Sequence, residues 1–215
     1  MGFDLYGIKP ESDIPKPDEP DFGNDKEGTK AYFAWQNNTP GAYFRNNVWY
    51  WRPLWEFISD NCADIITEKD IENGASNSAH KICKTKARRI AARIRRLDKE
   101  GALDIKSSSH KEHIKTLPQE ECNLCRGTGT REGMEGWQSQ EQWLRSHKSL
   151  ERVPEKDYEG VLLNVSWEWA NELNGCNGCK GTGKVENFQS HYPFDADNVR
   201  EFGKFCKESG GFEIC

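Results

Sequence analysis

The chain has 215 residues, 30% of them charged and 35% hydrophobic, with a formal net charge of −5. This length fits one large domain or a domain with a metal-bound lobe, and the acidic balance disfavours generic binding to polyanions. No stretch approaches the ~18 continuous apolar residues of a membrane helix, and no charged-then-apolar leader opens the chain. We therefore expect a cytoplasmic protein without membrane contact.

The first 30 residues predict a strand followed by a loop. Residues 3–8 alternate briefly between apolar and polar side chains, which is typical of a strand. Residues 9–30 contain four prolines among many Asp, Glu and Lys residues. Because proline restricts its own backbone and that of the preceding residue, we expect a mobile, extended loop there.

An aromatic segment comes next, with ten of the 24 aromatic residues between Tyr32 and Phe57. Pro53 predicts the first turn of a helix that runs to about Cys62, because a missing N–H is harmless at that position. A second short helix is expected over residues 63–71, ending near Gly74.

Residues 78–100 carry the clearest helical pattern. Apolar residues recur at spacings of three and four, with Asn77 or Ser78 as the expected N-cap and Gly101 at the C-terminal end. The outward positions are basic. The predicted nucleic-acid contacts on this face are Lys84, Arg88, Arg89, Arg93 and Arg96. Such a face can contact about four to six phosphates, but a solvated or protein-facing surface is the alternative.

Two later loops share the pattern Cys-x-x-Cys-x-Gly-x-Gly: residues 122–129, CNLCRGTG, and residues 176–183, CNGCKGTG. Two residues between cysteines let both sulfurs face one ion, and the glycines permit the positive φ of the turn. The predicted ligands of one structural zinc ion are Cys122, Cys125, Cys176 and Cys179. A thioredoxin-like redox pair or unrelated buried cysteines are the alternatives. The other four cysteines, at positions 62, 83, 206 and 215, are expected to be buried thiols rather than disulfides.

The rest of the chain is predicted to be mainly helical. Between the loops, helices are expected over residues 137–147 and 161–173, and after them a helix over 195–209 ends at Gly210 and leads into a last strand. The predicted fold is α+β and helix-rich, with a small sheet plus a four-cysteine zinc-bound lobe. Its expected divisions are a core region over residues 1–118, the zinc lobe over 119–185, and a C-terminal helix and strand over 186–215 that return to the core.

The two cysteine loops resemble those of the cysteine-rich domain of DnaJ-type chaperones. That family carries four such loops for two zinc ions, and this sequence has two, enough for one. The His-Pro-Asp signature of a J-domain is not in the sequence, so the resemblance does not imply chaperone activity. Residues 1–7, 43–55 (YFRNNVWYWRPLW) and 209–215 resemble uncharacterised proteins from phages and bacteria. This second resemblance implies a phage or prophage accessory protein, for example one used in counter-defence.

Residues 43–55 also form a candidate binding segment, because aromatic rings stack on bases and guanidinium groups clamp phosphates. The predicted ligand-binding residues are Arg45, Asn46, Asn47, Trp49, Trp51 and Arg52. In the alternative, the rings belong to the core and Asn46-Asn47 is a turn with left-handed geometry.

Enzymatic motifs are not evident: the sequence has no nucleophile elbow, Walker-type loop, HExxH or paired-Asp motif, and no catalytic residue is assigned. We therefore expect a non-enzymatic, zinc-stabilised binding protein that inhibits a host defence system, by binding a host protein or by sequestering a nucleotide-like ligand. The alternatives are a nucleic-acid-binding module that uses residues 81–99 and an enzyme acting on nucleotides or nucleic acid.

Overall fold

The computed structural model describes residues 2–10, 12, 14–129 and 178–215. The chain divides into two compact units, Met1–Thr116 with His191–Cys215 and Leu117–Ser190, called here the sheet unit and the knuckle unit. The helices expected over residues 137–147 and 161–173 lie outside the described residues.

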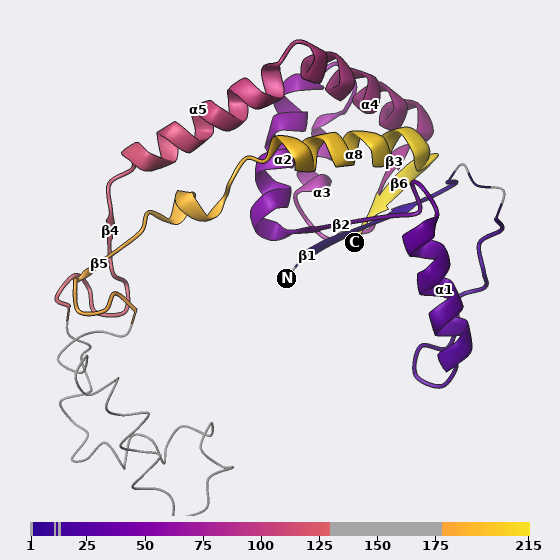
Figure 1. Ribbon diagram of the computed structural model, residues 1–215, viewed down its shortest axis with the longest axis horizontal. Coiled ribbons are helices and arrows are strands. Elements are labelled where there is room, and N and C mark those ends of the chain that lie inside the picture. The colour runs from indigo at the N-terminus through magenta and orange to yellow at the C-terminus, as the bar shows by residue number, and fades with distance from the viewer. Residues whose placement is uncertain (1, 11, 13, 130–177) are drawn as a thin grey trace, which may run out of the picture. The chain divides into compact units, whose positions relative to one another are not determined.

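A four-stranded antiparallel sheet organises the sheet unit, in the order β2-β1-β6-β3 (Figure 1). Its strands are β1 (Gly2–Gly7), β2 (Tyr43–Asn47), β3 (His80–Cys83) and β6 (Gly211–Ile214). The register pairs Leu5 with Phe44 on one side and with Ile214 on the other. The strands expected near the start and the end of the chain are thus neighbours in the middle of the sheet.

One face of the sheet is apolar, as the period of two along each strand requires. The buried apolar strand residues on this face are Phe3, Leu5, Ile82, Phe212 and Ile214. They share one core with three helices, α2 (Val48–Asn61), α4 (Lys84–Lys99) and α8 (Ala196–Glu208), which Figure 1 shows on one side of the sheet. A Cβ added to Gly203 of α8 would lie 3.0 Å from Cγ2 of Ile94, so α4 and α8 pack closely at this glycine.

Helix α2 begins five residues before Pro53, which lies inside the helix. The start is at Val48 because the side-chain oxygen of Asn47 accepts hydrogen bonds from the N–H groups of Trp49 and Tyr50, both at 3.0 Å. The prediction that Pro53 lies in the first turn is therefore wrong. The alternative prediction of a left-handed turn at Asn46-Asn47 is wrong as well, because Asn46 is part of β2 and Asn47 has a φ of −79°.

The helix expected over residues 78–100 is in fact a strand followed by a helix. His80–Cys83 forms β3, and α4 begins only at Lys84, with Cys83 as an N-cap that makes no side-chain hydrogen bond. Asn77 and Ser78 are not its caps. Gly101, with a φ of +72°, follows the end of α4 as predicted. The preceding helix, α3 (Glu68–Gly74), ends as expected but starts at Glu68, five residues later than expected.

Two helices have no counterpart in the predicted elements. Helix α1 (Lys26–Asn38) replaces the last part of the expected loop over residues 9–30, and Asp25 caps it by accepting a hydrogen bond from the N–H of Gly28 at 2.8 Å. Helix α5 (Ala102–Thr116) follows α4 directly. Each buries only two residues, so the sequence shows little apolar periodicity at either place.

Helix α8 and strand β6 match the prediction for the end of the chain. Asp195 caps α8 by accepting hydrogen bonds from the N–H groups of Asp197 and Asn198. Gly210 and Gly211, both with positive φ, turn the chain into β6. In the parts of the chain that the structure describes, no helix has the length and apolar character needed to cross a membrane.

Candidate metal centre

The knuckle unit brings the two cysteine loops together at the end of a short ribbon. Strands β4 (Glu120–Glu121) and β5 (Lys184–Val185) pair antiparallel, so the first loop starts beside the end of the second (Figure 1). The N–H of Cys122 donates a hydrogen bond to the carbonyl of Gly183 at 2.9 Å, which joins the loops directly.

From the second cysteine of each loop onward, the two loops have nearly the same backbone conformation. Their matched φ angles are 51° at Arg126 and Lys180, 78° and 81° at Gly127 and Gly181, and 78° and 73° at Gly129 and Gly183. In both, the threonine hydroxyl donates to the carbonyl of the second cysteine, at 2.6 Å in the first loop and 2.7 Å in the second. The repeated sequence therefore folds twice into one turn.

Close contact between the loops explains why both need the Gly-x-Gly repeat. A Cβ on Gly129 would lie 2.4 Å from the carbonyl oxygen of Gly181, and one on Gly183 would lie 2.2 Å from that of Gly127. Any larger residue at either position would push the loops apart.

Three cysteine sulfurs converge between the loops. Cys122, Cys125 and Cys179 are at most 6% exposed, and their Sγ atoms lie within 4.8 Å of one another. The N–H of Gly129 donates to Cys125 Sγ at 3.3 Å, and the N–H of Gly183 donates to Cys179 Sγ at 3.2 Å. Backbone donors aimed at sulfur suit a charged thiolate ligand.

The donor set and its spacing fit zinc. Four sulfurs at ~2.3 Å from a tetrahedral ion lie ~3.8 Å from one another, and the Cys125 and Cys179 sulfurs are 3.7 Å apart. Soft thiolates select zinc over magnesium or calcium, which prefer oxygen ligands. The buried cluster of Cys122, Cys125 and Cys179 can therefore hold a metal ion such as zinc. The fourth predicted ligand, Cys176, lies outside the described residues.

The remaining cysteines are free thiols in different surroundings. Cys62 and Cys206 are buried, and burial raises the pKa of the Cys62 thiol to about 11 and that of Cys206 well above its ordinary value. Cys215 is partly exposed and Cys83 is exposed, so the expectation of a buried thiol is wrong for Cys83.

The predicted ligand-binding residues of 43–55 face in opposite directions. Arg45, Asn47, Trp49 and Arg52 are exposed, whereas Asn46 and Trp51 are buried. The side-chain amide of Asn46 donates to the side-chain oxygen of Asn198 at 2.9 Å. Trp51 is fully buried between Phe3 and Trp55, and its ring N–H donates to the carbonyl of Gly74 at 2.8 Å.

Tyr192 joins two of the exposed residues into one cluster, which we call the Trp49 surface: Trp49, Arg52 and Tyr192. The rings of Trp49 and Tyr192 are 4.9 Å apart, and Nη1 of Arg52 donates to the Tyr192 hydroxyl at 3.2 Å. Trp49 keeps 38% of its surface exposed. Tyr192 lies 140 residues from Arg52 in the chain, so no local pattern pointed to it.

Three of the predicted basic residues of α4 lie close to acids of the same unit. Arg93 bonds both carboxylate oxygens of Asp64 at 2.9 Å, and Arg89 approaches the same carboxylate at 3.5 Å. Arg96 lies 3.7 Å from Glu100. Lys84 and Arg88 are exposed.

Comparisons with protein-family models, with curated proteins and with solved structures give no match for this chain. Function is therefore inferred from the residues themselves.

Proposed function

We propose that the chain is a non-enzymatic binding protein whose knuckle unit is held by one structural zinc ion. The observation that carries this proposal is the buried cluster of Cys122, Cys125 and Cys179 between two loops of the same conformation. Cys176 has the position in the second loop that Cys122 has in the first, so we expect it to supply the fourth thiolate. Four protein ligands leave no open position for water, which makes the ion a folding element.

The Trp49 surface supports a binding role. Tryptophan and arginine dominate the energetics of protein interfaces, and a ring beside a guanidinium group also suits a nucleobase and its phosphate. We propose that this surface contacts a host protein or a nucleotide-like ligand. The setting in phage counter-defence rests on the resemblance of residues 1–7, 43–55 and 209–215 alone.

Mass spectrometry of small molecules that co-purify with the protein, followed by nucleotide titration, tests this function. The informative variants are Trp49→Ala and Arg52→Ala, with Phe33→Ala as the control because Phe33 is another exposed ring elsewhere, at 46% against 38% for Trp49. Asn47→Ala is a poor probe, since Asn47 caps α2.

An intact nucleotide that is retained by the native protein and by Phe33→Ala, but lost from Trp49→Ala and Arg52→Ala, supports sequestration. A protein partner with the same dependence supports host-protein binding. Turnover of the nucleotide contradicts the proposal that the protein is not an enzyme. Binding that is unchanged in both Trp49→Ala and Arg52→Ala contradicts the assignment of the Trp49 surface as the binding site.

A further inference from the structure

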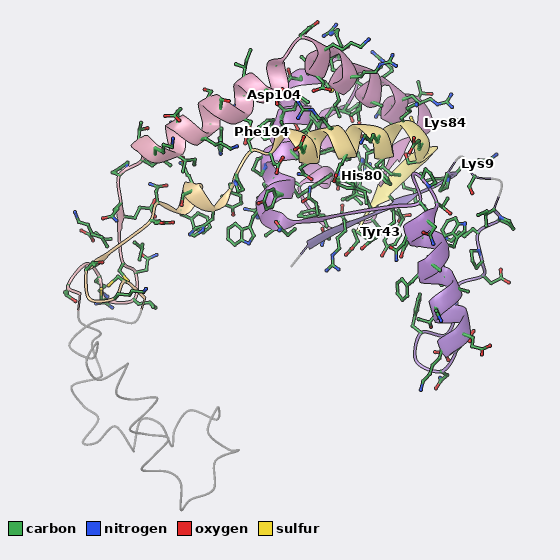
Figure 2. The ribbon with its side chains drawn as sticks, viewed as in Figure 1. Lys9, Tyr43, His80, Lys84, Asp104 and Phe194 are labelled. Carbon is green, nitrogen blue, oxygen red and sulfur yellow. The ribbon has the colours of Figure 1, made fainter. Side chains whose placement is uncertain are left out.

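A cleft of about 320 Å³ lies where α1 ends, where the chain turns into β2, and along α8. Figure 2 shows Tyr43, one of its lining residues, on the part of β2 next to the C-terminal end of α1. The other lining residues that matter to the argument are Gln36, Thr39, Phe44, Glu201, Phe205 and Glu208.

The backbone fixes the walls of this cleft. Gly41 has a φ of +74°, and a Cβ there would lie 2.3 Å from the carbonyl carbon of Glu208, so the turn presses directly against the end of α8. The N–H of Ala42 donates to the carbonyl of Thr39 at 3.1 Å, and the N–H of Gly7 in β1 donates to the carbonyl of Ala42 at 2.9 Å. The turn is thereby tied to both the sheet and α8.

The charge of the cleft is negative. The C-terminal ends of α1 and α8 both lie at it, and a helix C-terminus carries partial negative charge. Glu201 and Glu208 are seven residues apart on α8 and therefore share one face. Within the described part of the chain neither carboxylate has an ion-pair partner, and no lysine or arginine lines the cleft. Such a site attracts cations and repels phosphates.

One nearly buried polar group at the cleft lacks a partner. Thr39 is 5% exposed, and its hydroxyl has no hydrogen bond to any described residue. Because buried polar groups are almost always bonded, this hydroxyl points to a ligand that hydrogen-bonds with it.

The remaining wall is aromatic. The rings of Phe44 and Phe205 are stacked at 5.6 Å, and the partly exposed Phe44 offers an apolar surface to a methylene stem. We propose that the cleft binds an organic cation, an ammonium or guanidinium group on a short apolar stem, supplied by a free polyamine or by a basic side chain of a peptide. This site is separate from the cysteine cluster and from the Trp49 surface.

Calorimetric titration with spermidine and with an arginine-containing peptide tests the proposal. The double variant Glu201→Gln/Glu208→Gln is compared with Glu56→Gln/Glu72→Gln, which changes the net charge equally at two exposed glutamates outside the cleft. We expect at least one cation to bind the native protein and the control, and the cleft variant to bind it about tenfold more weakly or worse, because charge-assisted hydrogen bonds are lost. Thr39→Val should weaken binding without lowering the melting temperature.

Tighter binding of spermidine identifies a free polyamine as the ligand, and tighter binding of the peptide identifies a side chain; either result supports the site. Amide NMR of the native protein adds a readout that needs no variant, and the largest shifts are expected at residues 36–42. The proposal is overturned if neither cation binds at millimolar concentration, if both double variants lose the same affinity, or if the shifts fall elsewhere.

Discussion

Asp70 is a buried carboxylate that joins three elements of the sheet unit. It accepts hydrogen bonds from the N–H and hydroxyl of Thr67, both at 2.8 Å, and it contacts His80 Nε2 at 2.9 Å and the amine of Lys86. Burial alone would raise the pKa of the Asp70 carboxyl, but the hydrogen bonds from Lys86, Thr67 and His80 outweigh it and hold that pKa well below its usual range. The charged form therefore stabilises the contact of α3 with β3 and α4.

Asp70→Asn is expected to lower the free energy of unfolding by about 2–3 kcal/mol at pH 7, because hydrogen bonds to a charged group are lost. A carboxyl whose pKa is lowered by folding stabilises the folded state at any pH above its pKa in the unfolded chain, which is ~3.9 for Asp. This stabilisation is lost as the pH falls toward the pKa in the folded protein. The difference in free energy of unfolding between the native protein and Asp70→Asn should thus be at its full size at pH 7 and shrink below about pH 4. Urea unfolding across pH measures it, with Asp18→Asn, an exposed loop residue, as the control. A difference that is independent of pH would contradict this role.

Arg200 is the hub of a second polar cluster, which ties α8 to α4 and α5. It bonds Asp98 at 2.7 Å and both Asp104 and Asp197 at 2.8 Å. The hydrogen bonds that Arg200 donates to these three carboxylates, that to Asp104 first, raise its pKa above the ordinary value.

Arg200→Ala should therefore destabilise the protein by about 1–2 kcal/mol, because single exposed pairs contribute up to about 1 kcal/mol and here three carboxylates lose one partner. The cost should fall in high salt. Arg96→Ala removes one exposed pair, with Glu100, and should cost less than about 0.5 kcal/mol. Chemical denaturation at low and high salt compares the two, and equal costs would show that the cluster does not act as a network.

At the scale of elements, α2 shows how one segment contains both core and surface. Trp51 is fully buried, whereas Trp49, two residues earlier, keeps 38% of its surface exposed. The density of aromatic residues identified residues 43–55 as a candidate segment, but it did not show which rings point into the core. That direction depends on the start of α2, which the cap at Asn47 fixes. Sequence reasoning consequently grouped core and surface residues in one predicted ligand site.

Trp51→Ala should cost about 3–5 kcal/mol of stability, since it leaves a cavity and an unpaired carbonyl at Gly74. Trp49→Ala removes the same side chain from the surface and should cost about 1 kcal/mol or less. Thermal melting of the two variants checks this contrast. Similar losses for both would mean that the Trp49 ring is structural, which would remove the support for the Trp49 surface.

Elements were predictable where burial imposes a strong period. Val199, Phe202 and Phe205 all point into the core, and α8 was expected within one residue of its limits. In contrast, α5 buries only Leu103 and Ser107, so its sequence reads as a polar connection. Strand β3 was merged with α4 because Cys83 fits the helical spacing, and only the pairing with β6 separates them.

At the scale of the whole molecule, the two units differ in what holds them. The sheet unit has an extensive apolar core, whereas the described cluster in the knuckle unit consists of three cysteines with Val185 packed against them. The cysteine loops were predictable because both ligands and turn glycines are local in sequence. The cleft was not, since its walls come from residues 36–44 and 201–208.

Removal of metal with a chelator should therefore affect the units unequally. Hydrogen exchange is expected to accelerate strongly at residues 120–129 and 178–185, while β1 and β6 keep their protection, because the proposed ion would lie in the knuckle unit alone. Uniform loss of protection would show that the ion supports the sheet unit as well, and no change would show that the loops hold without metal.

Zinc content per chain, measured by elemental analysis, tests the central claim most directly. The native protein and Cys83→Ser, a control that removes an exposed thiol outside the cluster, should each carry one zinc ion. Cys125→Ser and Cys176→Ser should each carry none and should melt at lower temperature. A native protein without zinc, or a full equivalent retained in both knuckle variants, would contradict the account.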